Sequence, residues 1–355
     1  MTERKIKNIL IIASNTIHVL NYINLIKDEF DKVQLITNSE NKNFDYGNVE
    51  IFRADFSLRN PISFLKNIFK IRKIIKCNNP DVIHVHQLGT VSLLSLLANK
   101  STKIPTVYTA WGSDVLYVPK INFLYKAMLV YILKRGAFFT SDSVFMAEEM
   151  RRLAKKNLDV LIANFGINID DLMIAEKQNL IYSNRQLKKL YRIDLIIKAF
   201  AQFVNNNHSE DWKLIIGGEG EDKDVLVSLV KELNILDKVE FVGWLDKKMN
   251  SYYYCISRFY ISIPESDATS ISLLEAMAAG CIPIVSDLPA NREWINHGQN
   301  GIVVNDMIND FISKAKEINY SKAKEINRKL ILEHGTKDAN KAKFISYYKR
   351  VINEQ

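Results

Sequence analysis

Two acidic residues stand eight positions apart in ESDATSISLLEAMAAG, residues 265–280. The strand-like run FYISIP precedes this stretch, and ISLLEAMAAG has the composition of a helix. The first-turn amides of a helix have no intrahelical partners, so Thr269, Ser270 and the amides beside them form a candidate phosphate site. Glu275, about one and a half turns further along, could accept hydrogen bonds from two ribose hydroxyls. In the alternative interpretation, Asp267 caps the helix and Glu275 faces solvent.

A basic segment, SNRQLKKLYRID, could supply positive charge to this site. Arg185, Lys188, Lys189 and Arg192 follow one expected strand and precede an expected helix. Cations beside a phosphate site would neutralise a diphosphate and stabilise the charge that grows as it leaves. The alternative is a solvated basic loop. The sequence has neither a spaced His/Cys set nor an Asp-x-Asp triplet, so we predict no metal site and no cofactor.

Two further groups of polar residues end strands in the first half of the chain. His84 and His86 alternate in DVIHVH, so both point to one face of the expected strand. One of them is expected in the core, and the other, at the carboxyl edge, could reach a ligand. In WGSD, Gly112 permits a tight turn and Asp114 offers a carboxylate to a hydroxyl-bearing ligand.

The elements that carry these groups are short β-branched runs alternating with longer amphipathic runs. This alternation predicts an α/β fold in which parallel sheets are covered by helices. The pattern restarts near residues 168–178, so we expect Rossmann-like domains over residues 1–170 and 171–335. A C-terminal helix over residues 336–355 is expected to pack back on the N-terminal domain. Open parallel sheets bind ligands beyond the carboxyl ends of their strands, and the strand-end loops are therefore expected to face a central cleft.

The composition indicates a soluble globular protein, with 47% hydrophobic and 25% charged residues. The first apolar run is too short for a secretory signal, and no run approaches the roughly 20 residues of a membrane span. We therefore expect a cytoplasmic or peripheral protein. Cys77, Cys255 and Cys281 are widely separated, which favours buried thiols over disulfides or a zinc cluster.

The net charge of +8 lies entirely in the first half of the chain. Residues 1–170 contain 23 Lys and Arg against 15 Asp and Glu, whereas the remainder contains 25 of each. Such asymmetry predicts an anionic partner. The segments SFLKNIFKIRKIIK and KINFLYKAMLVYILKR mix apolar with basic residues and favour an anionic membrane, although ordinary helices with solvated cations are the alternative. No recognised nucleic-acid-binding module is present, so we expect no nucleic-acid partner.

The motifs together resemble a known family. The stretch from Pro264 to Val304 resembles the signature region of the retaining, nucleotide-sugar-dependent family-four glycosyltransferases of GT-B fold. DVIHVH, WGSD, IANFGINID and YSNRQLKKLYRIDLIIKAF match in order and spacing. The resemblance implies two Rossmann-like domains facing a central cleft. It also implies metal-independent transfer of a sugar from a nucleoside diphosphate to a glycan or lipid-linked acceptor hydroxyl, in the synthesis of bacterial-type surface glycans or glycolipids.

The resemblance also implies roles for individual residues. Glu275 would hold the donor ribose, and Asp267 would face the hydroxyls of the donor sugar. His86 would lie beside the reacting sugar, and Asp114 would line the acceptor side with it. The residues implied for catalysis are His86, Asp267, Arg185 and Lys189. The residues implied for donor binding are Arg185, Lys189, Asp267, Thr269, Ser270, Ile271 and Glu275.

The sequence also departs from the family pattern. Asp267 stands where most members have Glu, and Thr269-Ser270 replaces the usual Phe-Gly. The spacing after Arg185 differs from the common Arg-to-Lys pattern, so either lysine of the basic segment could contact the diphosphate. These departures leave open a catalytically silent, sugar-nucleotide-binding subunit of a larger complex. An NAD-dependent oxidoreductase is a further alternative, but SNTIHV stands where that class carries G-x-G-x-x-G.

Overall fold

The computed structural model describes residues 6–39, 44–170, 172, 175–206, 211–305 and 310–354. The chain forms two compact units. The first unit contains the residues up to Phe165 together with those from Asn340 onward, and the second contains Gly166–Ala339. The chain therefore crosses between the units twice. The expected domain boundary, between residues 170 and 171, lies slightly later than the first crossing, and residue 171 itself is outside the described residues.

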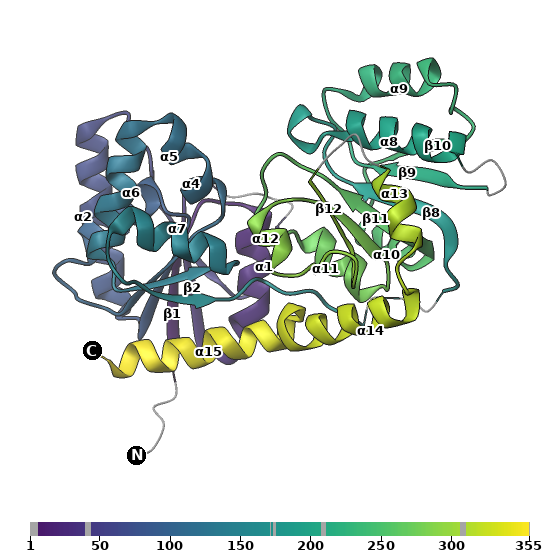
Figure 1. The fold of residues 1–355 in the computed structure, drawn as a ribbon. Coiled ribbons are helices and arrows are strands. Elements are labelled where there is room, and N and C mark those ends of the chain that lie inside the picture. The colour runs from purple at the N-terminus through teal and green to yellow at the C-terminus, as the bar shows by residue number, and fades with distance from the viewer. Residues whose placement is uncertain are drawn as a thin grey trace. The chain divides into compact units, whose positions relative to one another are not determined.

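The first unit is built on a parallel sheet that has seven strands within the described residues (Figure 1). Its strand order is β3-β2-β1-β4-β5-β6-β7, and every pairing is parallel. The order reverses between β1 and β4, and in doubly wound folds the crevice beside such a reversal binds ligands. The strands are β1 (Asn8–Ile12), β2 (Lys32–Thr37), β3 (Glu50–Arg53), β4 (Val82–His86), β5 (Thr106–Thr109), β6 (Phe138–Ser141) and β7 (Asp159–Ile162).

Helices cover both faces of this sheet. Alternate residues of β1 point to opposite faces, so Leu10 and Ile12 join one core cluster and Ile9 and Ile11 join the other. Helices α2, α3, α6 and α7 pack on the first cluster, and α1 and α15 pack on the second. The helices are α1 (Ile17–Ile26), η1 (Lys27–Glu29), α2 (Pro61–Asn78), α3 (Thr90–Asn99), α4 (Ser113–Leu116), α5 (Val118–Ile121), α6 (Phe123–Arg135), α7 (Val144–Ala154) and α15 (Lys337–Asn353).

Helix α2 has well-defined ends. The Asn60 side chain accepts hydrogen bonds from the first-turn amides, Pro61 opens the helix, and Asn79 ends it in the left-handed conformation. Cys77, near its C-terminus, is exposed, whereas Cys255 and Cys281 are buried. The prediction that all three thiols are buried is therefore wrong for Cys77, because it lies on the side of α2 that faces away from the sheet.

The second unit repeats the plan, with six parallel strands among the described residues in the order β10-β9-β8-β11-β12-β13. The predicted alternation of strands and helices is thus confirmed in both units. The strands are β8 (Gln178–Asn184), β9 (Lys213–Gly217), β10 (Val239–Gly243), β11 (Ser257–Ser262), β12 (Ile282–Ser286) and β13 (Ile302–Val304). The helices are η2 (Lys189–Tyr191), α8 (Ile193–Asn206), α9 (Lys223–Glu232), α10 (Lys247–Ile256), α11 (Ile271–Ala278), α12 (Pro289–Arg292), α13 (Phe311–Lys316), α14 (Tyr320–Leu330) and η3 (Ile331–Gly335).

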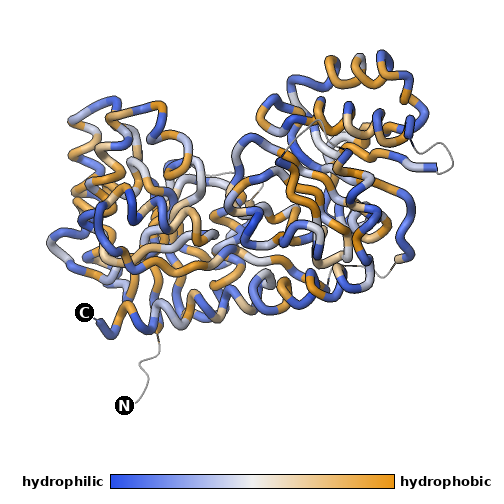
Figure 2. The backbone as a smooth tube through the Cα atoms, viewed as in Figure 1, coloured by the Kyte–Doolittle hydropathy of each residue, from blue (hydrophilic) through white to orange (hydrophobic). Residues whose placement is uncertain are grey.

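Helix α15 completes the core of the first unit. Its residues from Asn340 onward belong to that unit, where Phe344 and Tyr348 are fully buried. The Tyr348 hydroxyl lies 2.5 Å from Nδ1 of His84 on β4 and also hydrogen-bonds the Tyr22 hydroxyl of α1. Figure 2 shows hydrophobic and hydrophilic segments alternating along α15, as expected for a helix with one buried side.

Candidate functional site

The loop between β11 and α11 lies where the strand order of the second sheet reverses. Strand β8 pairs with β11 there, so the residues that follow these two strands emerge side by side. Ser270 is the N-cap residue of α11, and both it and Thr269 are largely buried. Leu273 and Leu274 make the first hydrogen bonds of the helix, to Ser270 O. The amides of Ile271 and Ser272 precede these bonds, so this end of α11 presents N–H donors and a favourable dipole to an anion.

Arg185 directly follows β8 and reaches this loop. Its guanidinium donates from Nη1 to Ser270 Oγ and from Nη2 to Asp267 Oδ2, both at 2.6 Å. Burial disfavours the charged form, but Asp267 outweighs it and holds the pKa of Arg185 above its ordinary value. The structure therefore brings together Arg185, Asp267 and Ser270, and it keeps a permanent positive charge beside the N-terminus of α11.

Sequence reasoning missed Tyr191, whose ring lies against this guanidinium. The Arg185 Cζ atom is 4.5 Å from the centroid of the Tyr191 ring, within the range of a cation–π contact. Tyr191 ends the short helix η2, and Arg192 follows it in the left-handed conformation, with φ 52°. The contact between the Tyr191 ring and Arg185 is tertiary, and no periodic pattern in the sequence marks it.

We expect Tyr191→Ala to weaken the positioning of Arg185. Cation–π contacts contribute about 0.5 to 2 kcal/mol, so kcat/KM should fall roughly 2- to 30-fold. Tyr191→Phe keeps the aromatic face and serves as the matched control, with kcat/KM within about twofold of wild type. Steady-state kinetics of both variants decide the point, because equal losses in Ala and Phe would show that the hydroxyl acts rather than the ring.

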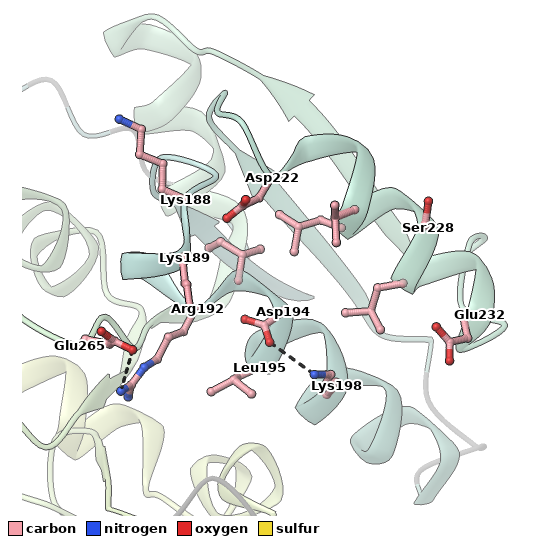
Figure 3. Close-up of a pocket in the computed structure, with 14 residues that line it drawn as sticks. Lys188, Lys189, Arg192, Asp194, Leu195, Lys198, Asp222, Ser228, Glu232 and Glu265 are labelled. Atoms are coloured by element: carbon pink, nitrogen blue, oxygen red, sulfur yellow. Dashed lines mark hydrogen bonds and ion pairs between the residues drawn. The ribbon is translucent and has the colours of Figure 1, made fainter.

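A second set of contacts joins the basic segment to the acidic loop. The Glu265 amide donates to Leu190 O at 3.0 Å, and Arg192 Nη2 lies 3.4 Å from Glu265 Oε1. Figure 3 shows Arg192 reaching Glu265 while Lys188 points away from it. Lys188 and Lys189 are exposed and line a cavity of about 560 Å³ between α8 and α9. Their side chains make no hydrogen bond or ion pair within the described residues, so the diphosphate role of Lys189 stays a prediction.

Glu275 lies on the second turn of α11, C-terminal to the loop. Its side chain is partly buried, and its charge is close to the buried phenols of Tyr182 and Tyr254. Burial first, then neighbouring negative groups that include Glu275, raise the pKa of both tyrosines. These phenols therefore remain protonated, and the Tyr182 hydroxyl donates to Asn250 Oδ1 at 2.6 Å.

His86 ends β4 in the first unit and is fully buried. Burial, and to a lesser degree the nearby His18, lower the pKa of His86 to about 3, so its imidazole is neutral at physiological pH. The indole Nε1–H of Trp111 donates to His86 Nδ1 at 3.4 Å. The ring proton therefore belongs on Nε2, which has no hydrogen-bond partner within the described residues. His86 is thus a neutral N–H donor.

His84, its neighbour on the same face, is a satisfied core histidine. It bonds Tyr22 and Tyr348 through Nδ1 and Thr109 through Nε2. Its pKa is lowered well below the ordinary value, mainly by burial and then by His86. His84 therefore ties β4 to α1 and α15.

Asp114 is also buried, at the start of the helical turn that follows Gly112. Its carboxylate accepts the Leu88 amide at 2.8 Å and the Trp111 amide at 2.9 Å. These bonds join the loop after β4, which follows His86, to the loop after β5. As placed, Asp114 holds the two strand-end loops together, and its expected contact with an acceptor stays a prediction.

The titration of Asp114 should appear in the pH dependence of stability. Burial raises the pKa of Asp114 to about 6, although four backbone hydrogen bonds oppose the shift. The folded state therefore holds the proton more tightly than the unfolded state, so the Asp114 contribution to stability falls as pH rises from about 4 to 6. The free energy of unfolding of Asp114→Asn, relative to wild type, should rise over this window and then level off. Urea titrations at pH 4 to 7 measure this difference, and a flat profile would contradict the raised pKa.

Two family models match the chain in succession. The model described as glycosyl transferase 4-like matches residues 8–143, and the model described as glycosyl transferases group 1 matches residues 164–331. Between them they cover most of both units. The chain belongs to the glycosyltransferases. Its basic segment, the β11–α11 loop and Glu275 all lie within the second match.

Curated relatives align with this glycosyltransferase over only part of their own length. N-acetyl-alpha-D-glucosaminyl L-malate synthase of Bacillus anthracis is 26% identical over 252 residues, which are 65% of this chain and 63% of that protein. Alpha-monoglucosyldiacylglycerol synthase of Streptococcus pneumoniae is 24% identical over 248 residues, 61% of this chain and 54% of that protein. The chain thus spans less than two thirds of the length of these relatives.

Solved structures resemble the glycosyltransferase over almost its whole length. A glycosyltransferase from Rickettsia africae has a TM-score of 0.80 at 17% identity, covering 99% of this chain and 100% of the other. Anabaena HepE in complex with UDP has a TM-score of 0.79 at 13% identity, covering 97% and 100%. These likenesses show the fold, and the prediction of a GT-B fold with two Rossmann-like domains is confirmed.

Proposed function

We propose that this glycosyltransferase moves a sugar from a nucleoside diphosphate to an acceptor hydroxyl with retention of configuration. The supporting observation is the Arg185 guanidinium held by Asp267 and Ser270 at the N-terminus of α11. A cation, hydroxyl groups and a helix dipole converge there, as a diphosphate leaving group requires. HepE and the pneumococcal O-GlcNAc transferase GtfA, both solved with UDP, support this donor class.

Arg185 is assigned to the diphosphate. A guanidinium carries five N–H donors, and the contacts to Asp267 and Ser270 use two of them, so others can meet phosphate oxygens. Thr269, Ser270 and the Ile271 amide are assigned to the same group, with Lys189 as a second cation. Within the described ranges, no group of three or more His, Cys, Asp and Glu side chains could hold a metal ion. We assign the neutralising charge to Arg185, held beside the N-terminus of α11, and to Lys189.

The carboxylates are assigned to the rest of the donor. Glu275 accepts hydrogen bonds from the ribose hydroxyls, and Asp267 accepts them from the sugar. In the transfer step, the acceptor oxygen bonds to the anomeric carbon on the face from which the diphosphate departs, as the bond from that carbon to the phosphate oxygen breaks. The acceptor proton passes to the departing phosphate oxygen. Bond making and breaking on one face retain the configuration without a protein nucleophile.

The acceptor is assigned to the first unit, with His86 and Asp114 as its residues. A neutral His86 would act there as an Nε2–H donor to a sugar oxygen, not as an acid or base. The names of relatives support a lipid-linked acceptor: one is a monoglucosyldiacylglycerol synthase, and another is a Campylobacter jejuni transferase that acts on a diphospho-undecaprenol-linked sugar. We place the reaction in the synthesis of a surface glycan or glycolipid.

A panel of nucleotide sugars tests the proposal. The donor should raise the melting temperature in proportion to the logarithm of its excess over Kd, and transfer should proceed in EDTA. The anomeric configuration of the product, read by NMR, tests retention. No stabilisation by any nucleotide sugar would contradict donor binding, and stabilisation without hydrolysis or transfer would indicate a silent binding subunit.

A further inference from the structure

The outer side of helix α2 carries an unusual row of exposed apolar residues. Its inner side packs Ile68, Ile71 and Ile75 into the core. On the opposite side, Ile62, Leu65 and Phe69 are 66, 55 and 61% exposed. Their spacing of three and four residues places them on one stripe. The first half of α2 therefore presents a continuous apolar ridge away from the sheet.

Lysines continue this stripe along the helix. Lys66, Lys70, Lys73 and Lys76 are exposed, and none forms an ion pair with an acidic residue in the part of the chain that the structure describes. No acidic residue occurs between Asp55 and Asp81 in the sequence. The charge of α2 is therefore uncompensated along its own length. We call Ile62, Leu65, Lys66, Phe69, Lys70 and Lys73 the α2 surface.

A second apolar and basic patch lies on the same side of the sheet. Helices α2, α3 and α6 pack on one core cluster, and Figure 1 shows α2 and α6 over the same part of the first unit. At the junction of α5 and α6, Phe123 and Leu124 are 78 and 66% exposed, with Lys120 and Lys126 close in sequence. Exposed apolar and basic side chains are thus combined in both patches.

We propose that the α2 surface docks on the anionic face of a phospholipid bilayer, with α2 parallel to the membrane plane. Its apolar ridge enters the boundary between headgroups and acyl chains, and its lysines meet lipid phosphates. No helix within the described ranges is long and apolar enough to span a bilayer, and an in-plane contact requires no such helix. This proposal adds an anionic membrane as a partner of the proposed enzyme. It rests on the proposed function in one respect, because the lipid-linked acceptor proposed above would lie in the same bilayer.

Charge distinguishes the bilayer from a second copy of the chain. A symmetric contact through the α2 surface would oppose one row of lysines with another, and like charges across an interface disfavour association. Anionic lipids instead supply many mobile negative charges over a flat area, together with an apolar layer for the ridge. The apolar ridge and the lysines of α2 together therefore fit an anionic membrane.

Vesicle binding of the full chain tests the proposal. Sedimentation with phosphatidylglycerol-containing vesicles at low salt should recover the protein, whereas neutral phosphatidylcholine vesicles or 0.5 M salt should not. Cys77 supplies a reporter on the outer side of α2, because the other two thiols are buried. An environment-sensitive fluorophore on Cys77 should shift to shorter wavelength with anionic vesicles alone. Absence of salt-sensitive binding to the anionic vesicles would overturn the proposal, and an acidic protein would then be the candidate partner.

Matched variants locate the contact. Each basic residue near an anionic surface contributes about fivefold to binding, so Lys66→Gln/Lys70→Gln/Lys73→Gln should weaken vesicle binding roughly 100-fold. Leu65→Ser/Phe69→Ser should weaken it at least about tenfold, because two large apolar side chains lose their burial. The control Lys231→Gln/Lys322→Gln/Lys329→Gln removes the same charge from exposed lysines of the second unit. Equal losses in the control and the α2 variants would overturn the assignment to α2.

A donor assay separates this proposal from the proposed function. The α2 variants leave the Arg185 site unchanged, so thermal stabilisation by the nucleotide sugar and its slow hydrolysis should match wild type. Transfer to an acceptor embedded in anionic vesicles should fall in parallel with vesicle binding. Wild-type transfer to embedded acceptor by a variant that no longer binds vesicles would overturn docking while leaving the enzyme assignment intact. If the wild-type protein does not bind the donor, the assignment as an enzyme is overturned instead.

Discussion

Arg185→Ala should lower kcat about 10²-fold, because it removes the cation that faces the growing charge on the diphosphate. The loss should fall equally on kcat and kcat/KM, as expected for an interaction made in the transition state. The change also removes the partner of Asp267, so a melting curve must first show that the variant is folded. Steady-state kinetics with saturating donor then give the loss.

Arg192→Ala is the matched control for this experiment. It removes the same charge from the same segment, but Arg192 pairs with the more exposed Glu265 at the start of the β11–α11 loop and not with Asp267 or Ser270. Exposed ion pairs contribute about 1 kcal/mol or less, so kcat should change less than about fivefold. A wild-type kcat in Arg185→Ala, or an equal loss in both variants, would place the leaving group elsewhere.

Glu275→Ala should weaken donor binding about 10- to 150-fold with little effect on folding. The estimate follows from hydrogen bonds between a charged carboxylate and the ribose, about 1.5 to 3 kcal/mol. Calorimetric titration with the nucleoside diphosphate of the preferred donor measures the change. Glu325→Ala, which removes an exposed carboxylate from α14, should bind the nucleotide as wild type does.

Deoxy nucleotides make this test specific for the ribose. Nucleotides lacking the 2′- or 3′-hydroxyl should bind wild type more weakly, and the loss should largely disappear in Glu275→Ala, because the two changes remove the same hydrogen bonds. Independent, additive losses would show that Glu275 does not contact the ribose, whatever its effect on affinity.

Periodicity was sufficient to predict the fold from this sequence. Most buried strands are short apolar runs, many of them rich in β-branched residues, and most covering helices are longer, so two parallel units and a C-terminal helix followed from local pattern. Periodicity could not decide which side of α2 is buried. Apolar residues occur on both sides of that helix, Ile68 and Ile71 inside and Leu65 and Phe69 outside. Packing against the sheet determines which side of α2 is buried. The exposure of Cys77 follows from that packing.

The candidate site was predictable only in part. The positions of Arg185, Asp267 and Ser270 after strands, together with the family resemblance, predicted that these residues share one site. The structure places them in contact. Tyr191 was not predictable, because no local pattern shows that its ring lies against Arg185. The burial of Asp114 was not predictable either, because one of the amides that it binds, that of Leu88, comes from a loop 26 residues earlier in the sequence. Local sequence shows which groups are present, whereas tertiary contacts decide what they touch.

The double crossing of the chain constrains how the protein folds during synthesis. The core of the first unit contains Phe344, Tyr347 and Tyr348 of α15, and these residues leave the ribosome after the whole second unit. The N-terminal sheet therefore lacks α15 while the second unit is synthesised. During that time Tyr22 and His84 have no contact with the Tyr348 hydroxyl. Synthesis that stops near residue 339 would yield a finished second unit attached to an unfinished first one. The nascent first unit is thus the expected client of chaperones.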